Sequence, residues 1–504
     1  MTPTKSLTDR TLNGLLWIFS GTVAQSALSF VILIVLARLL TPTEFGIVNA
    51  ALIVVGVSQI FSQLGIGPAI VQHPNLSAVH IHNGFTLSIL IGVAVGIFVA
   101  LVAPLIAQFF RMAELKQVIE VLALVFPLTG LSVVCQAVLQ REMQFRKLAI
   151  IQFSSYALGY GLVGVILAFT GWGVWALVYA QLGQALVNTI ILMSVKRQII
   201  GFAINKTEIG ELLNFGTGLS LAQIANYLAL QGDNLVVGRL LGVEALGVYG
   251  RAYHFLAMPA NLLGNIADKT LFPAMASIQD DKQRLGHAYQ RVVAIIAMVT
   301  LPLSGLLIAL APEIILLVLG PQWTDAIAPF QMLAVVLFFR TGYRISDSLV
   351  RATGAVYRSA WRKVIYAGSV IICAWIGHFW GLLGVAIGVG LAIILQFLLM
   401  FQLSVSLTTA SWTTLSKTLL RHSTVAILVG GSAWSVKALL GNYNLYIGYT
   451  LLISGAVAIG VIAIMGAVYH DLFGEEGAWI GLLIGRHRQT IHNRLFASQQ
   501  SPEP

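Results

Sequence analysis

The chain has 504 residues, of which 58% are hydrophobic and only 10% are charged, and its mean hydropathy is +0.87. Soluble domains carry about a quarter charged residues, so this composition excludes a soluble enzyme and indicates a chain whose solvent is mostly lipid. The formal net charge is +10. Because the basic residues are spread over many short polar breaks, they favour contact with anionic lipid and not with nucleic acid.

Apolar runs of about 20 residues, long enough to cross a bilayer, recur along the chain. They lack the alternation of a transmembrane barrel strand, so an all-α integral membrane fold is predicted. We expect fourteen transmembrane helices, at residues 11–38, 45–71, 83–110, 117–140, 148–170, 173–195, 212–238, 245–272, 288–311, 324–350, 357–379, 381–407, 418–439 and 445–469.

The basic residues give an independent prediction of orientation. With the N-terminus inside, most of the 29 Lys and Arg residues fall in the inner connections, among them Arg141, Arg146 and Lys147. Lys and Arg collect on the cytoplasmic side of membrane proteins. An even number of helices with both termini in the cytoplasm is therefore predicted.

Several short matches indicate an internal repeat. Arg38-Leu39-Leu40 is matched by Arg239-Leu240-Leu241, and Gly46 and Gly247 follow at the same spacing; Trp172-Gly173 is likewise matched by Trp380-Gly381. We interpret the matches as a duplication of six helices, with the two copies in pseudo-two-fold relation. The predicted regions are an N-lobe at 1–200, a C-lobe at 201–410, two added helices at 411–470 and a cytoplasmic tail at 471–504 with an interfacial helix. Two lobes that rock against each other are typical of transporters.

The second copy carries a family resemblance. The stretch 238–253 (GRLLGVEALGVYGRAY), with Met258-Pro259, Phe272-Pro273-Ala274 and Gln279-Asp280-Asp281, resembles the polysaccharide flippases. Leu139-Gln140-Arg141 with Phe145-Arg146, and Gly171-Trp172-Gly173, add to it, so the resemblance covers nearly the whole chain. It is nearest to the colanic-acid and teichuronic-acid exporter type of the multidrug, oligosaccharidyl-lipid and polysaccharide exporter (MOP) superfamily.

The resemblance implies a MATE-like fold. It also implies movement of undecaprenyl-pyrophosphate-linked oligosaccharide, for exopolysaccharide, capsule or lipopolysaccharide O-antigen, across the bacterial cytoplasmic (inner) membrane. The partners implied are that lipid-linked substrate, membrane lipid, H⁺ or Na⁺, and the polymerase and glycosyltransferases of the same polysaccharide biosynthesis route.

Charged residues within membrane spans are costly and point to function. Arg340, Arg344, Asp347 and Arg351 lie four, three and four residues apart, which places them on one helical face within about 60°. Arg340 and Arg344 are predicted to bind a pyrophosphate or an acidic sugar through forked hydrogen bonds. Alternatively, Asp347 pairs with Arg344 or Arg351 and locks the inner helix ends. We favour a binding role for Arg340 and an interfacial one for Arg351.

The seventh predicted helix has a polar stripe that suits sugar hydroxyls, formed by Gln223, Asn226, Asp233 and Asn234 with Tyr227 beside it. Asp233 either carries a coupling H⁺ or Na⁺ or pairs with Arg251, another cavity candidate. Asp347 and His254 are the other ion-coupling candidates. For His254 the reason is that a histidine titrates near neutral pH. A hydrogen bond to a neighbour is the plainer role for His254.

In the first copy, amides share helix faces at Gln59 and Gln63 and at Gln181 and Gln184. They either line the cavity or bridge helices, and bridging is the commoner role. The histidines His73, His80 and His82 invite a metal site, but a short solvated connection is favoured.

Other chemistry is not indicated. The sequence has no Gly-x-x-x-x-Gly-Lys-[Ser/Thr] loop and no metal-ligand spacing, so neither ATP, a cofactor nor a metal is predicted. A MATE-type exporter of cationic drugs is one alternative, but it calls for an acidic cavity, against Arg251, Arg340 and Arg344. The enzyme alternative, a membrane-embedded polysaccharide polymerase or ligase, calls for a long outer loop that we do not find.

Overall fold

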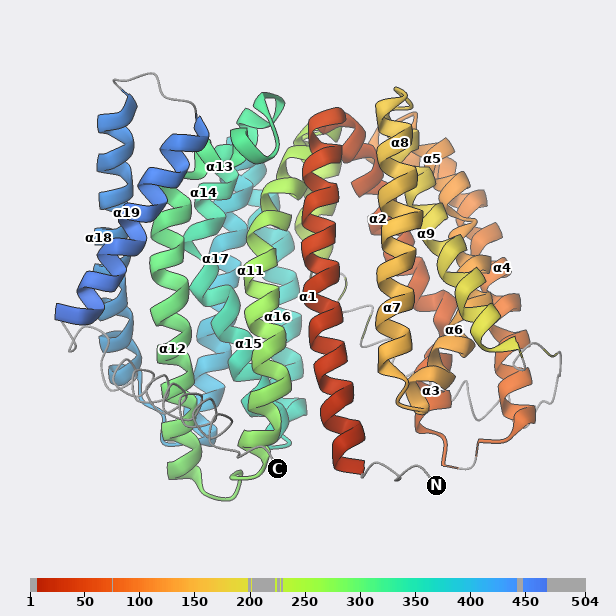
Figure 1. The fold of residues 1–504 in the computed structure, drawn as a ribbon, viewed down its shortest axis with the longest axis horizontal. Helices are drawn as coiled ribbons and strands as arrows, with labels where there is room; N and C mark the ends of the chain where they lie inside the picture. The colour runs from red at the N-terminus through yellow and green to blue at the C-terminus, as the bar shows by residue number, and fades with distance from the viewer. Residues whose placement is uncertain are drawn as a thin grey trace, which may run out of the picture. The chain divides into compact units, whose positions relative to one another are not determined.

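A computed structural model describes residues 7–74, 76–197, 201, 223, 227, 230–441 and 447–468. Every regular element in these ranges is a helix (Figure 1), which confirms the predicted all-α fold. Ten of the described helices are long and apolar enough to cross a membrane, or eleven if one bent pair forms a single span. The chain is therefore a multi-pass membrane protein, and the count of fourteen helices stays a prediction.

The chain forms two compact units. Unit 1 comprises Met1–Arg251, Val318–Trp323 and Ala367–Val385. Its helices are α1 (Leu7–Leu39), α2 (Pro42–Gln63), α3 (Ile66–Gln72), α4 (Ala78–Phe110), α5 (Leu115–Leu122), α6 (Val125–Arg141), α7 (Phe145–Ser155), η1 (Tyr156–Leu162), α8 (Val163–Phe169), α9 (Val174–Val195), a helix over residues 230–240, and the beginning of α11 (Val243–Ala276).

The turn into α2 shows how local chemistry starts a helix. The Thr41 side chain accepts a hydrogen bond from the Glu44 backbone N–H, while the Glu44 carboxylate accepts one from the Thr41 N–H at 2.6 Å. Pro42 follows at the first helical position, where no N–H is needed. The capping box of Thr41 and Glu44 thus starts α2 within three residues of the end of α1.

The two glycines of the repeated motif lie against each other in unit 1. A Cβ atom at Gly46 would lie 1.9 Å from the carbonyl oxygen of Val243, and one at Gly247 would lie 1.8 Å from that of Pro42. Only a residue without a side chain permits backbones to approach this closely. The beginnings of α2 and α11 therefore cross at corresponding positions of the repeat.

A π-helical segment, η1, interrupts the column formed by α7 and α8 (Figure 1). At its centre, Gly159 approaches the α9 backbone so closely that an added Cβ would lie 2.4 Å from the amide nitrogen of Gln184. Tyr156 and Tyr160 stack with ring centroids 5.0 Å apart. Single π-turns inside helices are rare and occur often at functional sites.

Unit 2 comprises Ala252–Leu317, Thr324–Tyr366 and Ala386–Pro504. Its helices are the remainder of α11, α12 (Lys282–Ala309), α13 (Ala311–Val318), α14 (Ile327–Val335), α15 (Leu337–Ala352), the first half of α16 (Val356–Gly377), most of α17 (Gly381–Leu407), α18 (Trp412–Gly441) and α19 (Ile447–Val468). The short 3₁₀ turn η3 (Pro321–Ala326) is divided between the units, and η4 (His378–Trp380) belongs to unit 1 with the second half of α16. A core that includes Tyr289, Phe338, Phe397 and Phe401 joins α12, α15 and α17.

The structure corrects the predicted span 45–71, whose helix ends at Gln63 because Leu64 and Gly65 are left-handed. It also corrects the span 324–350, which is not continuous. It divides into η3 with α14 and then α15, and the two parts are bent by 46°. The break falls at Val336, so α15 begins at Leu337 and carries all four charged residues of the predicted stripe. A broken helix in a membrane protein exposes a free helix end, which is a common element of transporter sites.

The two units do not follow the predicted boundaries at residues 200 and 410. Residues 230–251 pack with the first unit because α11 begins against α2, and 318–323 join it because the Trp323 indole donates to the Ala37 carbonyl at 2.8 Å. The predicted lobes describe a repeat of topology, and they stay a prediction.

Candidate functional site

Arg340 is the most deeply placed cation of α15. Its side chain is 8% exposed, and its Nη1 donates to the Tyr253 hydroxyl at 2.6 Å. The guanidinium carbon lies 4.4 Å from the centre of the Tyr253 ring. A cation–π contact and a neutral hydrogen bond satisfy the guanidinium only in part, since its five donors form a rigid fork.

The surroundings of Arg340 are aromatic and neutral. Its electrostatic neighbours among the described residues are the tyrosines 253, 343 and 366, with no carboxylate among them. Tyr343 and Tyr366 lie close together, with ring centroids 6.4 Å apart. Arg340 also sits in the first turn of α15, where free backbone N–H groups add partial positive charge. The arrangement suits an anionic ligand.

Arg344 lies one turn further along α15 and is half-buried. Its Nη1 approaches the Ala260 carbonyl of α11 at 3.5 Å, a long contact. An added Cβ at Gly264 would lie 2.3 Å from this Nη1. Gly264 therefore leaves room for the guanidinium, which is held loosely compared with that of Arg340.

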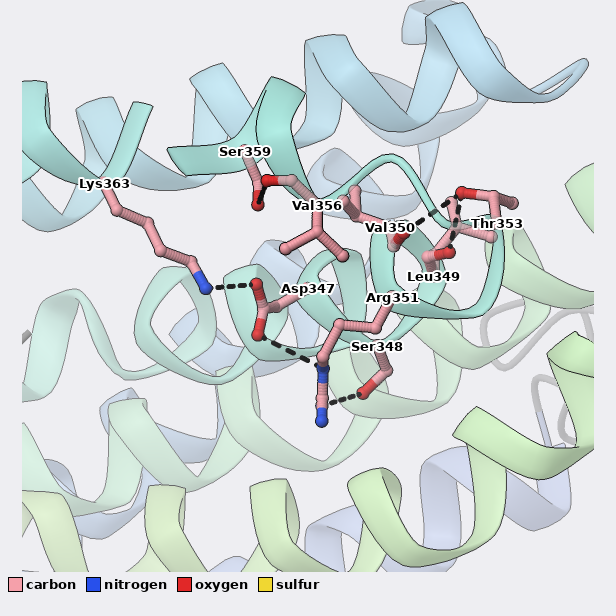
Figure 2. A network of polar contacts seen from close by, with 9 residues as sticks. All are labelled: Asp347, Ser348, Leu349, Val350, Arg351, Thr353, Val356, Ser359 and Lys363. Carbon is pink, nitrogen blue, oxygen red and sulfur yellow. Dashed lines mark hydrogen bonds and ion pairs between the residues drawn. The ribbon is translucent and has the colours of Figure 1, made fainter. Parts of the chain in front are cut away.

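Asp347 has two cationic partners (Figure 2). Its Oδ1 lies 2.7 Å from Lys363 Nζ, and its Oδ2 lies 3.5 Å from Arg351 Nε. Arg351 also donates to the Ser348 hydroxyl at 3.3 Å and lies over the Phe272 ring. The predicted pairing with Arg351 is present and that with Arg344 is not. Lys363 was missed because it belongs to the next helix, α16.

In unit 1, Asp233 and Arg251 each have a partner other than the one predicted. Asp233 is 1% exposed and accepts a hydrogen bond from the Tyr249 hydroxyl at 2.9 Å. Arg251 donates to the Asn49 Oδ1 of α2 at 3.1 Å and lies 4.6 Å above the Phe45 ring. The crossing of α2 and α11 causes this, because it brings Asn49 and Phe45 to Arg251.

Arg251 resembles Arg340 in its neighbours. The stacked tyrosines 156 and 160 of η1 are its electrostatic neighbours, and its Nε has no hydrogen-bond partner among the described atoms. Sequence reasoning missed these tyrosines and Asn49, since no local pattern shows which distant helices face Arg251. In the described part of each unit, therefore, an arginine lies among tyrosines.

The remaining candidates of the 212–238 segment are only partly described. Asn234 is 9% exposed and donates to the Gln231 side chain at 2.8 Å. Tyr227 is half-buried and donates to the Leu52 carbonyl at 3.1 Å, and Gln223 is exposed. Asn226 lies outside the described residues.

The other candidates are spread along unit 1 and the start of unit 2. Gln59 donates to the Thr129 hydroxyl at 3.0 Å and so bridges α2 to α6, the commoner of its two predicted roles. Gln63 is exposed at the end of α2, and Gln181 and Gln184 are half-buried on α9. His254 is exposed on α11.

Metal-ligating groups do not converge within the described part of the chain, where no three His, Cys, Asp or Glu side chains could hold an ion together. The ring of His80 instead caps α4: its Nδ1 lies 2.6 Å from the Ser77 hydroxyl. The His73 and His80 rings are 4.4 Å apart. Both free cysteines are in helices, with Cys135 fully buried.

Comparison with known families places the chain. Residues 35–328 match the family model described as "Polysaccharide biosynthesis protein". The chain belongs to this family. Among its relatives, the succinoglycan biosynthesis transport protein ExoT of Rhizobium meliloti (strain 1021) is 30% identical over 66% of this chain and 67% of its own. The lipopolysaccharide biosynthesis protein WzxC of Escherichia coli (strain K12) is 27% identical over 76% and 78%.

Solved structures agree on the fold. The lipid II flippase MurJ in an inward closed conformation has a TM-score of 0.74 and 17% identity, over 90% of this chain and 99% of its own. An inward-facing MATE family multidrug transporter of the MOP superfamily has a TM-score of 0.61 and 17% identity, over 76% and 94%. The predicted MATE-like architecture is thus confirmed.

Proposed function

We propose that this family member is a flippase that moves an undecaprenyl-pyrophosphate-linked oligosaccharide across the bacterial cytoplasmic membrane by alternating access. The names of the relatives support export of a surface polysaccharide, since ExoT is a succinoglycan transport protein and TuaB of Bacillus subtilis is a teichuronic acid biosynthesis protein. The substrate then serves exopolysaccharide, capsule or O-antigen formation, alongside a polymerase and glycosyltransferases.

The observation that carries the proposal is the environment of Arg340. A buried guanidinium without a carboxylate is costly in a membrane protein, so an intramembrane arginine of this kind points to an anionic ligand. The pyrophosphate of a lipid-linked sugar accepts the fork of Arg340, and Arg344, loosely held at 3.5 Å from its carbonyl partner, is free to add a second. Cationic drugs would meet repulsion here, which disfavours a MATE-type drug exporter.

Fewer residues are candidates for carrying the coupling ion than the sequence predicted. Asp233 is almost fully buried and hydrogen-bonded to Tyr249, which supports it as the carrier of H⁺ or Na⁺. Asp347 already has two cations, so we assign it to structure. His254 is exposed on α11 and remains a coupling candidate through titration.

The membrane orientation follows the distribution of basic residues, with both termini in the cytoplasm. We assign the chain to transport and not to catalysis, because the described neighbours of Arg340 are tyrosines and include no paired acid and base.

The test uses bacterial cells that lack the protein. Mass spectrometry of lipid extracts should show one undecaprenyl-pyrophosphate glycan accumulating, relieved by the wild-type protein and not by Arg340→Ala. Relief by both proteins would keep the flippase but remove Arg340 from the site. Unchanged lipid-linked intermediates together with new sensitivity to cationic drugs would instead establish a drug exporter.

A further inference from the structure

Unit 1 contains a polar cavity that the proposed function does not yet use. It has a volume of about 230 Å³ and lies between α1, α6 and α7. Four glutamine side chains line it, together with smaller and apolar residues: Gln25, Gln136, Gln140 and Gln152, with Gly21, Thr22, Phe145, Leu148 and Ala149.

The spacing of these residues brings one face of each helix to the cavity. On α6, Gln136 and Gln140 are four residues apart, and on α7 Phe145, Leu148, Ala149 and Gln152 follow the same helical period. The cavity exists beside a tight crossing, since an added Cβ at Gly21 would lie 2.7 Å from the Ala149 Cβ. The backbones of α1 and α7 therefore fix its width.

The cavity lies at one end of the membrane spans. On two of its three helices the lining is terminal: Gln140 is next to the end of α6, and Phe145 begins α7. Arg141 and the basic residues 146 and 147 stand at the same end. By the positive-inside rule, this is the cytoplasmic end of unit 1.

The lining chemistry selects a neutral, hydroxyl-rich ligand. Each glutamine amide offers two N–H donors and a carbonyl acceptor, which matches adjacent sugar hydroxyls. None of the nine lining residues is charged, so the cavity has nothing to hold a pyrophosphate as an arginine fork would. No protein hydrogen bond occupies the four glutamines in the described part of the chain, and a simple helix bridge like that of Gln59 would have used them.

The volume sets the size of the ligand. Pockets for drug-sized ligands measure about 300 to 1,000 Å³, so this cavity of about 230 Å³ takes a single sugar ring and not an oligosaccharide. Phe145 adds an apolar surface on which the C–H face of a ring can rest.

From these observations we propose that the glutamine cavity is a subsite for one neutral hexose of the lipid-linked glycan, entered from the cytoplasmic side. The inference rests on the proposed function and extends it, because it assigns recognition of a sugar to a cavity within unit 1.

The experiment compares two probes on the purified full-length protein in lipid nanodiscs. One is undecaprenyl pyrophosphate, and the other is the same lipid carrying one glucose or one galactose. Wild type should bind at least one of the hexose-bearing lipids about tenfold more tightly than the bare lipid, since several amide hydrogen bonds add to the affinity. In Gln25→Met/Gln136→Met this ratio should fall to about one, with bare-lipid affinity unchanged.

Methionine keeps the length of the side chain and removes its hydrogen bonds. The matched control is Gln108→Met, at an exposed position of α4 outside the cavity, and it should keep the wild-type ratio. Binding of the bare lipid shows in the same samples that each variant is folded.

Two outcomes would count against the account, and they are distinct. A preference for hexose that survives in Gln25→Met/Gln136→Met would overturn the sugar subsite and leave the flippase untouched. No binding of either lipid by wild type would overturn the proposed function itself.

Discussion

Arg340 and Asp347 lie two turns apart on the same helix, yet their surroundings differ in kind. Arg340 is 8% exposed, and its described neighbours are tyrosines. Asp347 is bound by Lys363 and Arg351, whose side chains are each about two-fifths exposed. One end of α15 therefore holds a cation with no carboxylate among its described neighbours, and two turns along lies the ion network of Asp347 with Lys363 and Arg351 (Figure 2).

The difference shows that a row of charges on one helical face does not form one site. Each charge takes its role from the neighbouring helix: among the described side chains, α11 offers Arg340 a tyrosine, while α16 offers Asp347 a lysine. A cation left unpaired in the membrane points to a ligand, whereas a satisfied pair points to helix packing.

The largest effect is expected from Arg340→Gln. Loss of a buried guanidinium that binds an anion costs about 2 to 5 kcal/mol of binding, so surface polysaccharide output should fall by well over tenfold. Thermal stability should stay level or rise, because the variant removes a buried charge that has no carboxylate among its described neighbours. A polysaccharide assay of complemented cells checks the loss of output, and thermal scanning of the purified protein checks its stability. If Arg340→Gln lost activity only because the protein unfolds, Arg340 would have a structural role like that of Asp347 and not a binding role.

A smaller effect is expected from Gly264→Ala, which tests whether Arg344 contributes to ligand binding. The new methyl group would occupy the place of the Arg344 guanidinium, which lies 2.3 Å from it. Displacing the side chain should weaken undecaprenyl pyrophosphate binding about three- to tenfold, roughly 1 kcal/mol. Gly431→Ala, where an added Cβ meets no atom within 4 Å, is the control and should bind as wild type does. Equal affinity in both variants would show that Arg344 has no part in binding.

The ion network should affect stability and not binding. Asp347→Ala should lower the free energy of unfolding by about 1 kcal/mol, because both partners are partly solvated. The exchange Asp347→Lys/Lys363→Asp should restore part of the thermal stability lost in either single variant. Thermal scanning of the four proteins measures this, and independent, additive losses would mean that the pair does not interact.

The smallest effect is expected from Arg351→Ala. Its contact with Asp347 is long, at 3.5 Å, and Lys363 still neutralises the carboxylate. Such exposed pairs contribute about 0 to 1 kcal/mol, so export and melting temperature should both remain near wild type. A loss of export as large as that of Arg340→Gln would erase the distinction between the two ends of α15.

The fold could be predicted in large part from composition and apolar run length. Helix type and approximate bounds follow from them because lipid leaves a buried backbone no other partner. The break at Val336 could not be predicted, since Ala334, Val335 and Val336 continue the apolar run without a proline or glycine. Its position depends on how α14 and α15 pack on other helices.

The site could be predicted only as a set of residues. Spacing alone placed Arg340 and Asp347 on one face. The partners that separate their roles, Tyr253 and Lys363, come from other helices, 87 residues away in the case of Tyr253. The glutamine cavity escaped notice for the same reason, because its amides are distributed over α1, α6 and α7 and form no pattern within one segment.

The most direct test of the central claim is equilibrium binding of undecaprenyl pyrophosphate to the purified protein in nanodiscs, with Arg340→Ala and Arg351→Ala measured beside wild type. We expect Arg340→Ala to weaken binding by more than tenfold, and Arg351→Ala to stay within about twofold of wild type. Equal affinities for all three proteins would contradict the claim.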